Sequence, residues 1–541
     1  MRRAGRTPRS PRVRMFPSSA PTRASSRPNA VPRRPKAKPR LKIRAAADSG
    51  LPTVVRTARP AAKKAIRLAK ETINPGGDSG TSSAAVHAVD IRPSGTVISR
   101  RTLAKRPAIL HLPHQPAPVF TPPAWMLEEC HVAPARAGDQ SEILQLLAGL
   151  PSAPTRAEFH AAVDHPEHDA GNRLVARLAG RIVGHVEIVP RDLLVGATSV
   201  RGAVIDRVAV LPECRGAGHG QKLVRAAEER MRQSGAVVAF SRTRIAASFH
   251  ELGWSVLGRD CATPGRPTEI LSRLLEGKQR TGDAVTMRQW RHVELPAILR
   301  IYKQNTTRFV GPLDRNEAYS RWLVSRGAFD SILVALVGQD RYELHESSAR
   351  IVGYCIQAGN RVLEILADQE FPGLEREILA RVCAEAIEND RQEIVYESGV
   401  TDPLHEAVAG TAGLVQGGDR MIVAKVFRPL DLLTALAPSV AERLAAEGVR
   451  ETVELGLDAP GFRGSIIVAD GAATVHAGRV GRSYLRLSDD ELGRLLLGQC
   501  DPAEAVAAGR MDPSTQMAQK LAAQLFPRTP LWCPMWDDLP A

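Results

Sequence analysis

The seven cysteines of this 541-residue chain are widely spaced and include no Cys-x-x-Cys pair. An odd number without paired spacing argues against a disulfide framework and against a zinc site, and it favours a reducing compartment. No run of about 18 apolar residues occurs, so we expect no membrane span. The N-terminal part also lacks the continuous apolar segment of a secretion signal. These absences predict a cytoplasmic protein without a resident metal.

The positive charge of the chain is confined to its N-terminal leader. The formal net charge is +15, but residues 1–110 hold 26 Lys and Arg against 4 Asp and Glu, and the remainder holds 47 basic and 54 acidic residues. Richness in Pro, Ser and Arg predicts disorder over residues 1–125. The leader could contact nucleic acid or an anionic membrane, serve as a transit peptide, or be an over-extended gene start ahead of Met126.

The most informative segment is glycine-rich and lies between an apolar run and a helix. The run over residues 204–211 predicts a buried strand, and apolar residues at helical spacing predict a helix that ends at Ser234-Gly235. Between them stands Arg215-Gly216-Ala217-Gly218-His219-Gly220. Because glycines expose the main chain at a helix N-terminus, this turn predicts an anion site for phosphate groups.

The spacing of the glycines distinguishes among phosphate-binding loops. A Walker loop needs Lys followed by Ser or Thr, where this chain has Gln221-Lys222-Leu223, and the dinucleotide G-x-G-x-x-G step is also absent. The pattern [R/Q]-x-x-G-x-[G/A] is present and resembles the acyl-CoA loop of the GNAT N-acetyltransferases. The resemblance implies acetyl-CoA as cosubstrate, bound by Val208, Ala209, Val210, Arg215, Gly216, Ala217, Gly218, His219, Gly220, Gln221 and Phe249.

The predicted elements divide the folded part into three segments. Residues 128–275 follow the order β-α-α-β-β-β-α-β-α-β of a GNAT domain. Residues 283–428 repeat that order from a strand at Ala284–Arg288 to one at Glu393–Glu397, with a strand at Ser331–Val337 and a helix at Leu374–Glu388 between them. The loop before that helix is Ala367-Asp368-Gln369-Glu370-Phe371-Pro372-Gly373, whose acids would repel pyrophosphate at a helix N-terminus. We therefore expect a degenerate second GNAT domain. Residues 430–541 predict strands followed by helices and resemble a sterol-carrier-like domain.

This domain order resembles the enhanced intracellular survival family of acetyltransferases. The resemblance predicts an α+β protein with two tandem GNAT-fold domains, the first active, followed by a sterol-carrier-like α/β domain. It implies acetyl transfer to a primary amine of a small-molecule or peptide acceptor. The acidic balance after the leader favours a cationic acceptor. A homo-oligomer is compatible with the sequence, and nucleic acid would bind only through the leader.

The group that protonates the departing thiolate is not evident. The resemblance implies a tyrosine, but the two positions where such enzymes carry one are Phe249 and Trp254. Three alternatives follow: the thiolate leaves unassisted, His250 acts as the acid, or the protein binds acetyl-CoA and catalyses poorly.

For the base, the resemblance implies the C-terminal carboxylate, here that of Ala541, and Trp532 and Trp536 predict a docked terminus. Asp206 is the alternative base, because strand parity places it on the same face as Val204 and Val208, and Glu187 on the neighbouring strand is a further candidate. Two other functions remain open: a non-catalytic acyl-CoA-binding or regulatory protein, and lipid carriage by the C-terminal domain.

Overall fold

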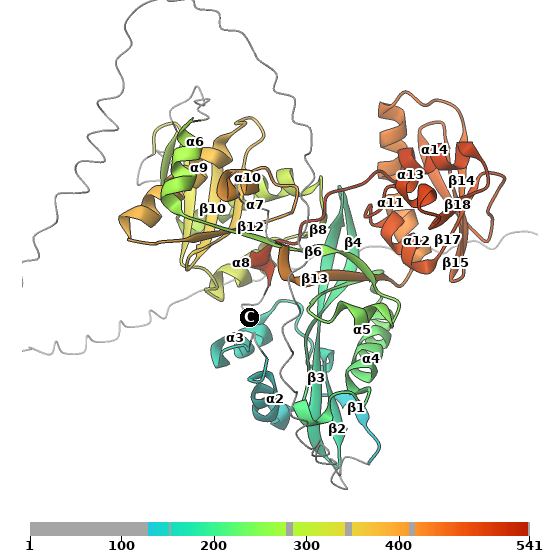
Figure 1. Ribbon diagram of the computed structural model, residues 1–541, viewed down its shortest axis with the longest axis horizontal. Coiled ribbons are helices and arrows are strands. Elements are labelled where there is room, and N and C mark those ends of the chain that lie inside the picture. Colours follow the sequence, from blue (N-terminus) through green and yellow to red (C-terminus); the bar gives the residue numbers. More distant parts are fainter. Residues whose placement is uncertain (1–127, 151–152, 277–284, 341–348, 411–416, 539–541) are drawn as a thin grey trace, which may run out of the picture. The chain divides into compact units, whose positions relative to one another are not determined.

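The computed structural model describes residues 128–538, except 151–152, 277–284, 341–348 and 411–416 (Figure 1). The predicted disordered leader and the carboxylate of Ala541 lie outside the described residues. No disulfide joins the seven cysteines, all of which lie in the described part. No helix in that part is long and apolar enough to cross a membrane.

The first segment confirms the predicted element order and adds one helix at its end. Its elements are β1 (His131–Pro134), α2 (Gln140–Leu147), α3 (Arg156–Ala161), β2 (Arg173–Leu178), β3 (Arg181–Val195), β4 (Thr198–Val210), α4 (His219–Gln233), β5 (Val238–Thr243), α5 (Ala246–His250), β6 (Ser255–Gly265) and α6 (Pro267–Glu276). The apolar runs at Leu174–Leu178 and Ile182–Val189 predict a hairpin with its turn at Ala179-Gly180, and this hairpin is present between β2 and β3. Ala179 and Gly180 both have positive φ there, 48° and 80°, as a two-residue type I′ turn requires.

The second segment contains the predicted elements and three that were missed, β8, α10 and β13. Its elements are β7 (Thr286–Gln289), α7 (Leu295–Thr306), β8 (Val310–Leu313), α8 (Glu317–Ser325), β9 (Ser331–Val337), β10 (Arg350–Ala358), β11 (Arg361–Ala367), α9 (Leu374–Glu388), β12 (Ile394–Ser398), α10 (Leu404–Ala409) and β13 (Gly417–Val426).

The third segment has its own five-stranded sheet, in the order β16-β15-β14-β17-β18. Its elements are α11 (Pro429–Ala446), β14 (Val453–Ala459), β15 (Phe462–Ala469), β16 (Ala472–Ala477), β17 (Tyr484–Leu487), α12 (Asp489–Leu496), α13 (Pro502–Ala507), β18 (Met511–Pro513) and α14 (Gln516–Leu525). Leu430, Leu433 and Leu436 predict an amphipathic helix that precedes residues 440–447, but the helix continues to Ala446. Helix α11 continues through Pro438, because both of its halves bury leucines, among them Leu433 and Leu444, on one side.

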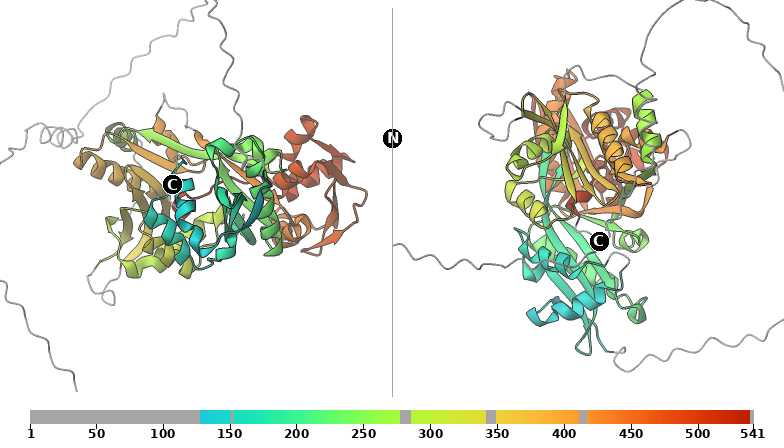
Figure 2. Two further views of the ribbon diagram at one scale, coloured as in Figure 1. Left: turned by 90° about the horizontal axis from the view of Figure 1, so that it is seen from below. Right: turned by 90° about the vertical axis from the view of Figure 1, so that its left-hand side faces the viewer.

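The first two segments share one sheet of 13 strands. Its order is β1-β2-β3-β4-β5-β13-β6-β12-β11-β10-β9-β7, with β8 paired to β3. Strand β13, from the end of the second segment, therefore lies between β5 and β6 of the first, and β6 pairs in turn with β12. Figure 2 shows these strands from two further directions. The sheet is thus continuous from one segment into the other.

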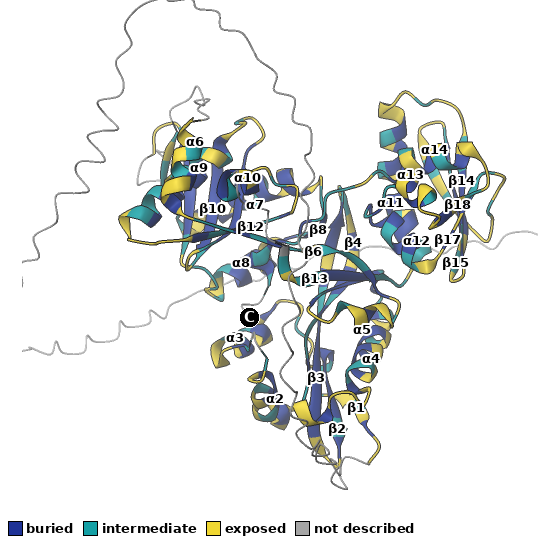
Figure 3. Cartoon of the chain, in the orientation of Figure 1, coloured by how far each residue is buried: buried dark blue, intermediate teal, exposed yellow. Residues whose placement is uncertain are grey.

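Helices cover both faces of the strands that carry the predicted site. Helix α4 packs on β3 and β4 from one side, and α2 packs on the same strands from the other (Figure 1). The strands between them are mostly buried, whereas the outer faces of the helices are exposed (Figure 3). The start of α4 is positioned by this packing, which buries Leu223, Ala227 and Met231 completely.

Candidate functional site

The glycine-rich segment forms an open turn between β4 and α4, as predicted. A short 3-10 turn (Pro212–Cys214) follows β4, and Gly218, with a φ of 81°, is the residue that precedes the first turn of α4. A Cβ atom added at Gly216 or Gly218 would meet nothing within 4 Å, so the main chain there is accessible. Both residues have positive φ, which explains why glycine is needed.

The backbone N–H groups of this turn are available for a ligand. The first helical bond runs from the N–H of Lys222 to the carbonyl of Gly218, at 3.0 Å. Among the described residues, the N–H groups of residues 216–221 have no backbone acceptor. The first turn of α4 contains no acidic residue, and α4 is 15 residues long. A helix N-terminus of this kind attracts phosphate oxygens through its N–H groups and its dipole.

The side chains of the turn do not fill it. The Arg215 guanidinium donates to the carbonyl of Val210 at 3.2 Å, and the Gln221 amide donates to Glu251 at 2.9 Å. His219 is buried, and burial lowers its pKa. The cofactor residues expected from the sequence thus lie over the end of β4 and the start of α4, except Phe249, which is buried on α5.

Strands β4 and β5 separate beside this turn. Their parallel pairing runs from Gly202 with Val238 to Ile205 with Ser241, and no pair follows. The hydroxyl of Ser241 donates to the carbonyl of Ile205 at 2.9 Å and closes the paired part. From Asp206 onward, β4 pairs only with β3 among the described strands. The main chain of Val208, Ala209 and Val210 consequently has one free edge that an extended ligand could occupy.

A bulge in β4 corrects the predicted strand parity. His185 pairs with Ala209, but Glu187 pairs with Asp206, so β4 has one extra residue between these pairs. Arg207 has a φ of 50° at this point. As a result, Ile205 and Val208 both pack into the core under α4. Asp206 and Val208 are therefore not on one face, because a bulge shifts the alternation of a strand by one residue.

Glu187 and Arg207 belong to a buried ionic network beneath the bulge. The Glu187 carboxylate accepts from Arg173 Nε at 3.2 Å and from Arg207 Nη1 at 2.8 Å. Burial acts to raise the pKa of Glu187, but the two guanidinium charges outweigh it and lower the pKa. His185 is buried beside the network, and its burial lowers its pKa to about 4. Glu187 is therefore held as an ion-paired carboxylate.

Asp206 has a different environment from Glu187, although the two residues pair across β3 and β4. Its carboxylate accepts from the N–H of Arg207 at 2.8 Å, and its side chain is 41% exposed. The surrounding strands still desolvate the carboxyl group, which raises its pKa against the lowering effect of Arg207. The charges of Glu187 and Asp538 raise it further. Of the two carboxylates, Asp206 is the one that is open to an incoming group.

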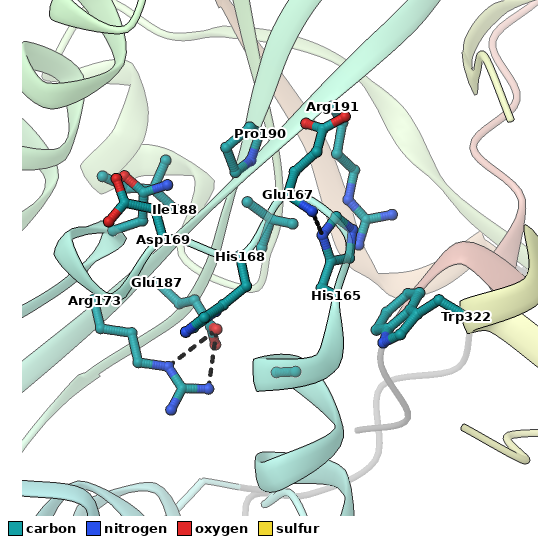
Figure 4. Close-up of a pocket in the computed structure, with 13 residues that line it drawn as sticks. His165, Glu167, His168, Asp169, Arg173, Glu187, Ile188, Pro190, Arg191 and Trp322 are labelled. Atoms are coloured by element: carbon teal, nitrogen blue, oxygen red, sulfur yellow. Dashed lines mark hydrogen bonds and ion pairs between the residues drawn. The ribbon is translucent and has the colours of Figure 1, made fainter. Parts of the chain in front are cut away.

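A small pocket lies between β3 and the residues that follow α3, with Trp322 of α8 at its side (Figure 4). His165 packs edge-on against Trp322 and Tyr319, with ring centroids 4.6 and 5.5 Å away, and its Nδ1 accepts from the N–H of Glu167 at 3.0 Å. Burial lowers the pKa of His165 to about 3, so its ring is neutral near pH 7. Arg191 is buried beside it and donates to the Tyr319 hydroxyl.

These pocket residues were missed by the sequence analysis. Trp322 and Tyr319 lie on α8, far along the chain from His165 and Arg191. No local pattern links the two regions. One signal lies nearby in the sequence: Thr155 with Glu158 three residues later predicts a helix start, and the capping box at the start of α3 confirms it.

The residues expected near the thioester occupy two environments. Phe249 and Trp254 pack edge-to-face at 5.2 Å in the core under α4, with exposed fractions of 2% and 0%. The Trp254 indole donates to Glu228 at 2.7 Å. His250 is exposed at the end of α5. Neither aromatic side chain reaches solvent, and His250 does.

The C-terminal segment is docked up to Asp538. The N–H of Val310 donates to the carbonyl of Pro530 at 2.9 Å, and the N–H of Trp532 donates to the carbonyl of Val310 at 3.0 Å. Asp537 pairs with the fully buried Arg315, whose other partner is Glu364, at distances of 2.8–3.0 Å. Asp538 pairs with Arg242 and, at 3.8 Å, with Arg420. The docked terminus predicted from the tryptophans is confirmed for these residues.

The corresponding loop of the second segment has a similar backbone and different chemistry. Gly373, with a φ of 86°, precedes the 15-residue helix α9 as Gly218 precedes α4. Asp368 occupies the loop and accepts from Arg300 at 2.7 Å, and the first turn of α9 contains Glu375 and Glu377. The carboxylates of Asp368, Glu375 and Glu377 therefore lie where a bound phosphate would need to lie.

The chain is similar to known proteins both in sequence and in fold. Residues 141–254 match the model of the Acetyltransferase (GNAT) family. The structure is similar to the GCN5-related N-acetyltransferase from Kribbella flavida, with 19% identity over 75% of this chain and 97% of that chain and a TM-score of 0.57. A GCN5-related N-acetyltransferase from Anabaena variabilis gives 16% identity, coverages of 74% and 97%, and a TM-score of 0.56.

A third similar structure is a conserved protein of unknown function from Enterococcus faecalis, described as a probable N-acyltransferase. It is 14% identical over 75% of this chain and 98% of that chain, with a TM-score of 0.55. No curated protein matches the chain. At these identities the structures show a shared fold, which extends well beyond the residues that the family model covers. The chain thus contains a GNAT acetyltransferase domain and has a fold consistent with acyl transfer.

Proposed function

We propose that this chain is an acetyl-CoA-dependent N-acetyltransferase that acts on a primary amine of a cationic acceptor. The observation that carries the proposal is the open turn at the start of α4. The N–H groups of residues 216–221 have no backbone acceptor there, and the adjoining strand β4 has a free edge. The pyrophosphate of acetyl-CoA would bind these N–H groups, and its pantetheine arm would pair with the main chain of residues 208–210.

The charges near the free edge of β4 support a cationic acceptor. Asp206 lies there with the Asp538 carboxylate close enough to raise its pKa. Glu167 and Asp169 line the pocket beside β3, and burial raises the pKa of Glu167. Carboxylates in a partly enclosed site attract an ammonium group and raise its local concentration. The acceptor would then lose a proton before its nitrogen attacks the thioester carbonyl.

Two carboxylates are candidates for the group that takes this proton. Asp206 is one, because its raised pKa makes it a better base than an ordinary aspartate. The terminal carboxylate of Ala541 is the other, since it follows the docked residue Asp538 by three positions. For the departing thiolate, His250 and unassisted departure both remain candidates, because Phe249 and Trp254 carry no acidic proton.

The second and third segments have separate roles in this proposal. The second is a degenerate GNAT domain, because Asp368 in the loop and two acids in the first turn of α9 lie where a cofactor would bind. The third is a sterol-carrier-like domain by its order of strands and helices. The first segment alone would hold acetyl-CoA.

The experiment that tests the proposal compares two matched glycine variants. Gly218→Asp and Gly373→Asp both place a carboxylate before a 15-residue helix, at a glycine with positive φ and with open space around it. We expect Gly218→Asp to weaken acetyl-CoA binding by about 100-fold or more, because the introduced carboxylate repels the pyrophosphate and replaces its contact with the main chain. Gly373→Asp should leave the binding unchanged. Affinity is measured by calorimetry.

The same proteins are then tested for turnover with a panel of amines, by the release of free thiol from acetyl-CoA. The wild type should show amine-dependent release, which Gly218→Asp abolishes and Gly373→Asp retains. Tight acetyl-CoA binding without amine-dependent turnover would instead favour a non-catalytic acyl-CoA-binding or regulatory protein. Equal binding in both variants would show that the cofactor does not lie at the turn.

A further inference from the structure

A second cavity, of about 460 Å³, lies where three parts of the chain meet. Its walls come from the turn between β3 and β4, the residues after α7, and helices α11, α12 and α14 with the residues that follow α14. None of its lining residues belongs to the turn before α4 or to the pocket beside β3. Ligand pockets in proteins enclose roughly 300–1,000 Å³, so this cavity can hold a small molecule.

Much of the wall is apolar. Leu436 and Val440 line it from α11, Leu495 from α12, and Leu525 and Phe526 from the end of α14. These five residues are at most 7% exposed. Side chains of this kind favour a hydrocarbon group, because its burial removes apolar surface from water.

Two guanidinium groups also line the cavity, Arg308 after α7 and Arg443 on α11. Within the described part of the chain, neither forms an ion pair with a carboxylate within 4 Å or donates a side-chain hydrogen bond. Arg308 lies over the Phe309 ring, 4.9 Å from its centroid. Arg443 interacts with the more distant charge of Glu447, and its partial burial lowers its pKa.

Arginines in the described part of the chain differ in their partners, since Arg273 donates to main-chain carbonyls whereas others pair with carboxylates. Arg315 and Arg242, for example, each pair with two carboxylates. Glu442 is the acidic residue that lines the cavity, and it is exposed and pairs with neither guanidinium. The cavity therefore combines an apolar wall with two guanidinium groups whose acidic neighbours, Glu375 for Arg308 and Glu447 for Arg443, interact with them only at a distance.

Hydrogen bonds hold the walls of the cavity together. The Thr198 hydroxyl, at the start of β4, lies 3.0 Å from the Ser439 hydroxyl of α11. The N–H of Gly196 in the β3–β4 turn donates to the carbonyl of Phe309 at 2.9 Å. These bonds join all three parts around the empty space, so its shape is defined before a ligand binds.

We propose that this cavity binds a single-chain carboxylic acid of fatty-acid type. The alkyl chain lies against the leucine-rich wall, and the carboxylate lies at Arg308 and Arg443. A carboxylate places negative charge in direct contact with these two guanidinium groups, and its two oxygens match the fork of a guanidinium. This site differs from a lipid site confined to the third segment, because β3, the β3–β4 turn and the residues after α7 supply part of its wall.

The test is calorimetric titration of the full chain with decanoate and with decanol, which share an alkyl chain and differ in charge. We expect decanoate to bind at one site per chain and decanol to bind about tenfold or more weakly, because the charge-assisted hydrogen bonds are lost. Arg443→Gln and Arg308→Gln should each weaken decanoate binding by about tenfold and leave decanol binding unchanged. Val440→Trp should abolish the binding of both, because the indole fills the cavity.

Two controls separate the site from a general loss of structure. Arg450→Gln, at an exposed residue outside the cavity, should bind decanoate like the wild type. Acetyl-CoA affinity should be unchanged in all four variants, and Arg308 is exposed, so its replacement preserves the fold. Absence of decanoate binding in the wild type, equal affinity for decanol, or unchanged affinity in both arginine-to-glutamine variants would overturn the proposal.

Discussion

At the scale of single residues, Arg207 determines the geometry of β4. Its positive φ creates the bulge. Its guanidinium pairs with Glu187, and its backbone N–H donates to the Asp206 carboxylate. A non-glycine residue with φ near 50° is strained by roughly 1–2 kcal/mol, and the buried ion pair on its side chain offsets that strain. At the bulge of Arg207, the Glu187 carboxylate is therefore buried in an ion pair, whereas the Asp206 carboxylate is accessible.

Glu187 and Asp206 should affect stability with opposite dependence on pH. The pKa of Glu187 is lowered in the folded chain, so its contribution is present above its usual value of 4.5 and disappears as the pH falls through the lowered value. The pKa of Asp206 is raised, so its ionisation costs stability as the pH rises from its usual value of 3.8 through the raised value.

The corresponding variants are Glu187→Gln and Asp206→Asn. Glu187→Gln should destabilise the protein by about 3 kcal/mol at pH 7, because two guanidinium groups lose their buried partner, and by less at pH 4. Asp206→Asn should stabilise it at pH 7 and have little effect below pH 3.8. Urea unfolding at the two pH values measures both changes.

A matched control for this pair is Glu229→Gln, whose carboxylate is 61% exposed on α4. It should change stability by at most about 1 kcal/mol at either pH. If Glu187→Gln changes stability as little as Glu229→Gln does, the ionic network beneath the bulge does not stabilise the protein.

At the scale of elements, the C-terminal segment is held by a buried arginine. Arg315 is 0% exposed and pairs with Glu364 of β11 and with Asp537. Strand β11 pairs with β12 only at Arg361 and Val362, so the segment docks where these strands have separated. In the first segment of the chain, β4 and β5 separate in the same manner beside the candidate acetyl-CoA site.

Asp537→Ala should release the end of the chain. The variant removes two charge-assisted hydrogen bonds from Arg315, which costs about 3 kcal/mol, and frees the buried indole of Trp536. We expect faster proteolysis between residues 526 and 538 and a red shift in tryptophan emission, with unchanged acetyl-CoA affinity. Asp512→Ala, at a side chain that is 76% exposed, should show neither change. Resistance of Asp537→Ala to proteolysis would mean that other contacts suffice to dock the segment.

Elements with a local signal were predicted well, and elements defined by distant partners were not. The bounds of α9 and β9 match the predicted ones, and α13 matches a helix predicted at Pro502–Ala507, because apolar spacing, Gly373 and a proline at the first turn mark them in the sequence. Strand β13 was missed, since its partners β5 and β6 lie more than 150 residues earlier. The turn before α4 was predictable from its glycines, whereas the pocket beside β3 was not, because Trp322 and His165 come from separate segments.

At the scale of the whole molecule, the placement of β13 makes the first two segments depend on each other. Lys425 of β13 extends this link, because its ammonium group lies 2.9 and 3.0 Å from the oxygens of Glu228 on α4. The residues that the family model matches, 141–254, include neither β6 nor β13. The matched part is therefore smaller than the unit that folds.

A chain truncated to residues 128–276 should fail to form a stable monomer. Without β13, the long edges of β5 and β6 lose their shared partner, and exposed strand edges promote aggregation. Residues 128–428, which retain β13, should be more soluble. Size-exclusion chromatography and circular dichroism measure the difference. A soluble 128–276 monomer with cooperative unfolding would contradict this dependence.

The position of β13 also determines when the first segment can be completed during translation. Residues 417–426 are synthesised well over 100 residues after β6, which at about 5–20 residues per second corresponds to a delay of roughly ten seconds. For that time the ribosome-bound chain has a gap in its sheet between β5 and β6. A chaperone that shields these edges during synthesis should therefore increase the yield of folded protein more than one added after release.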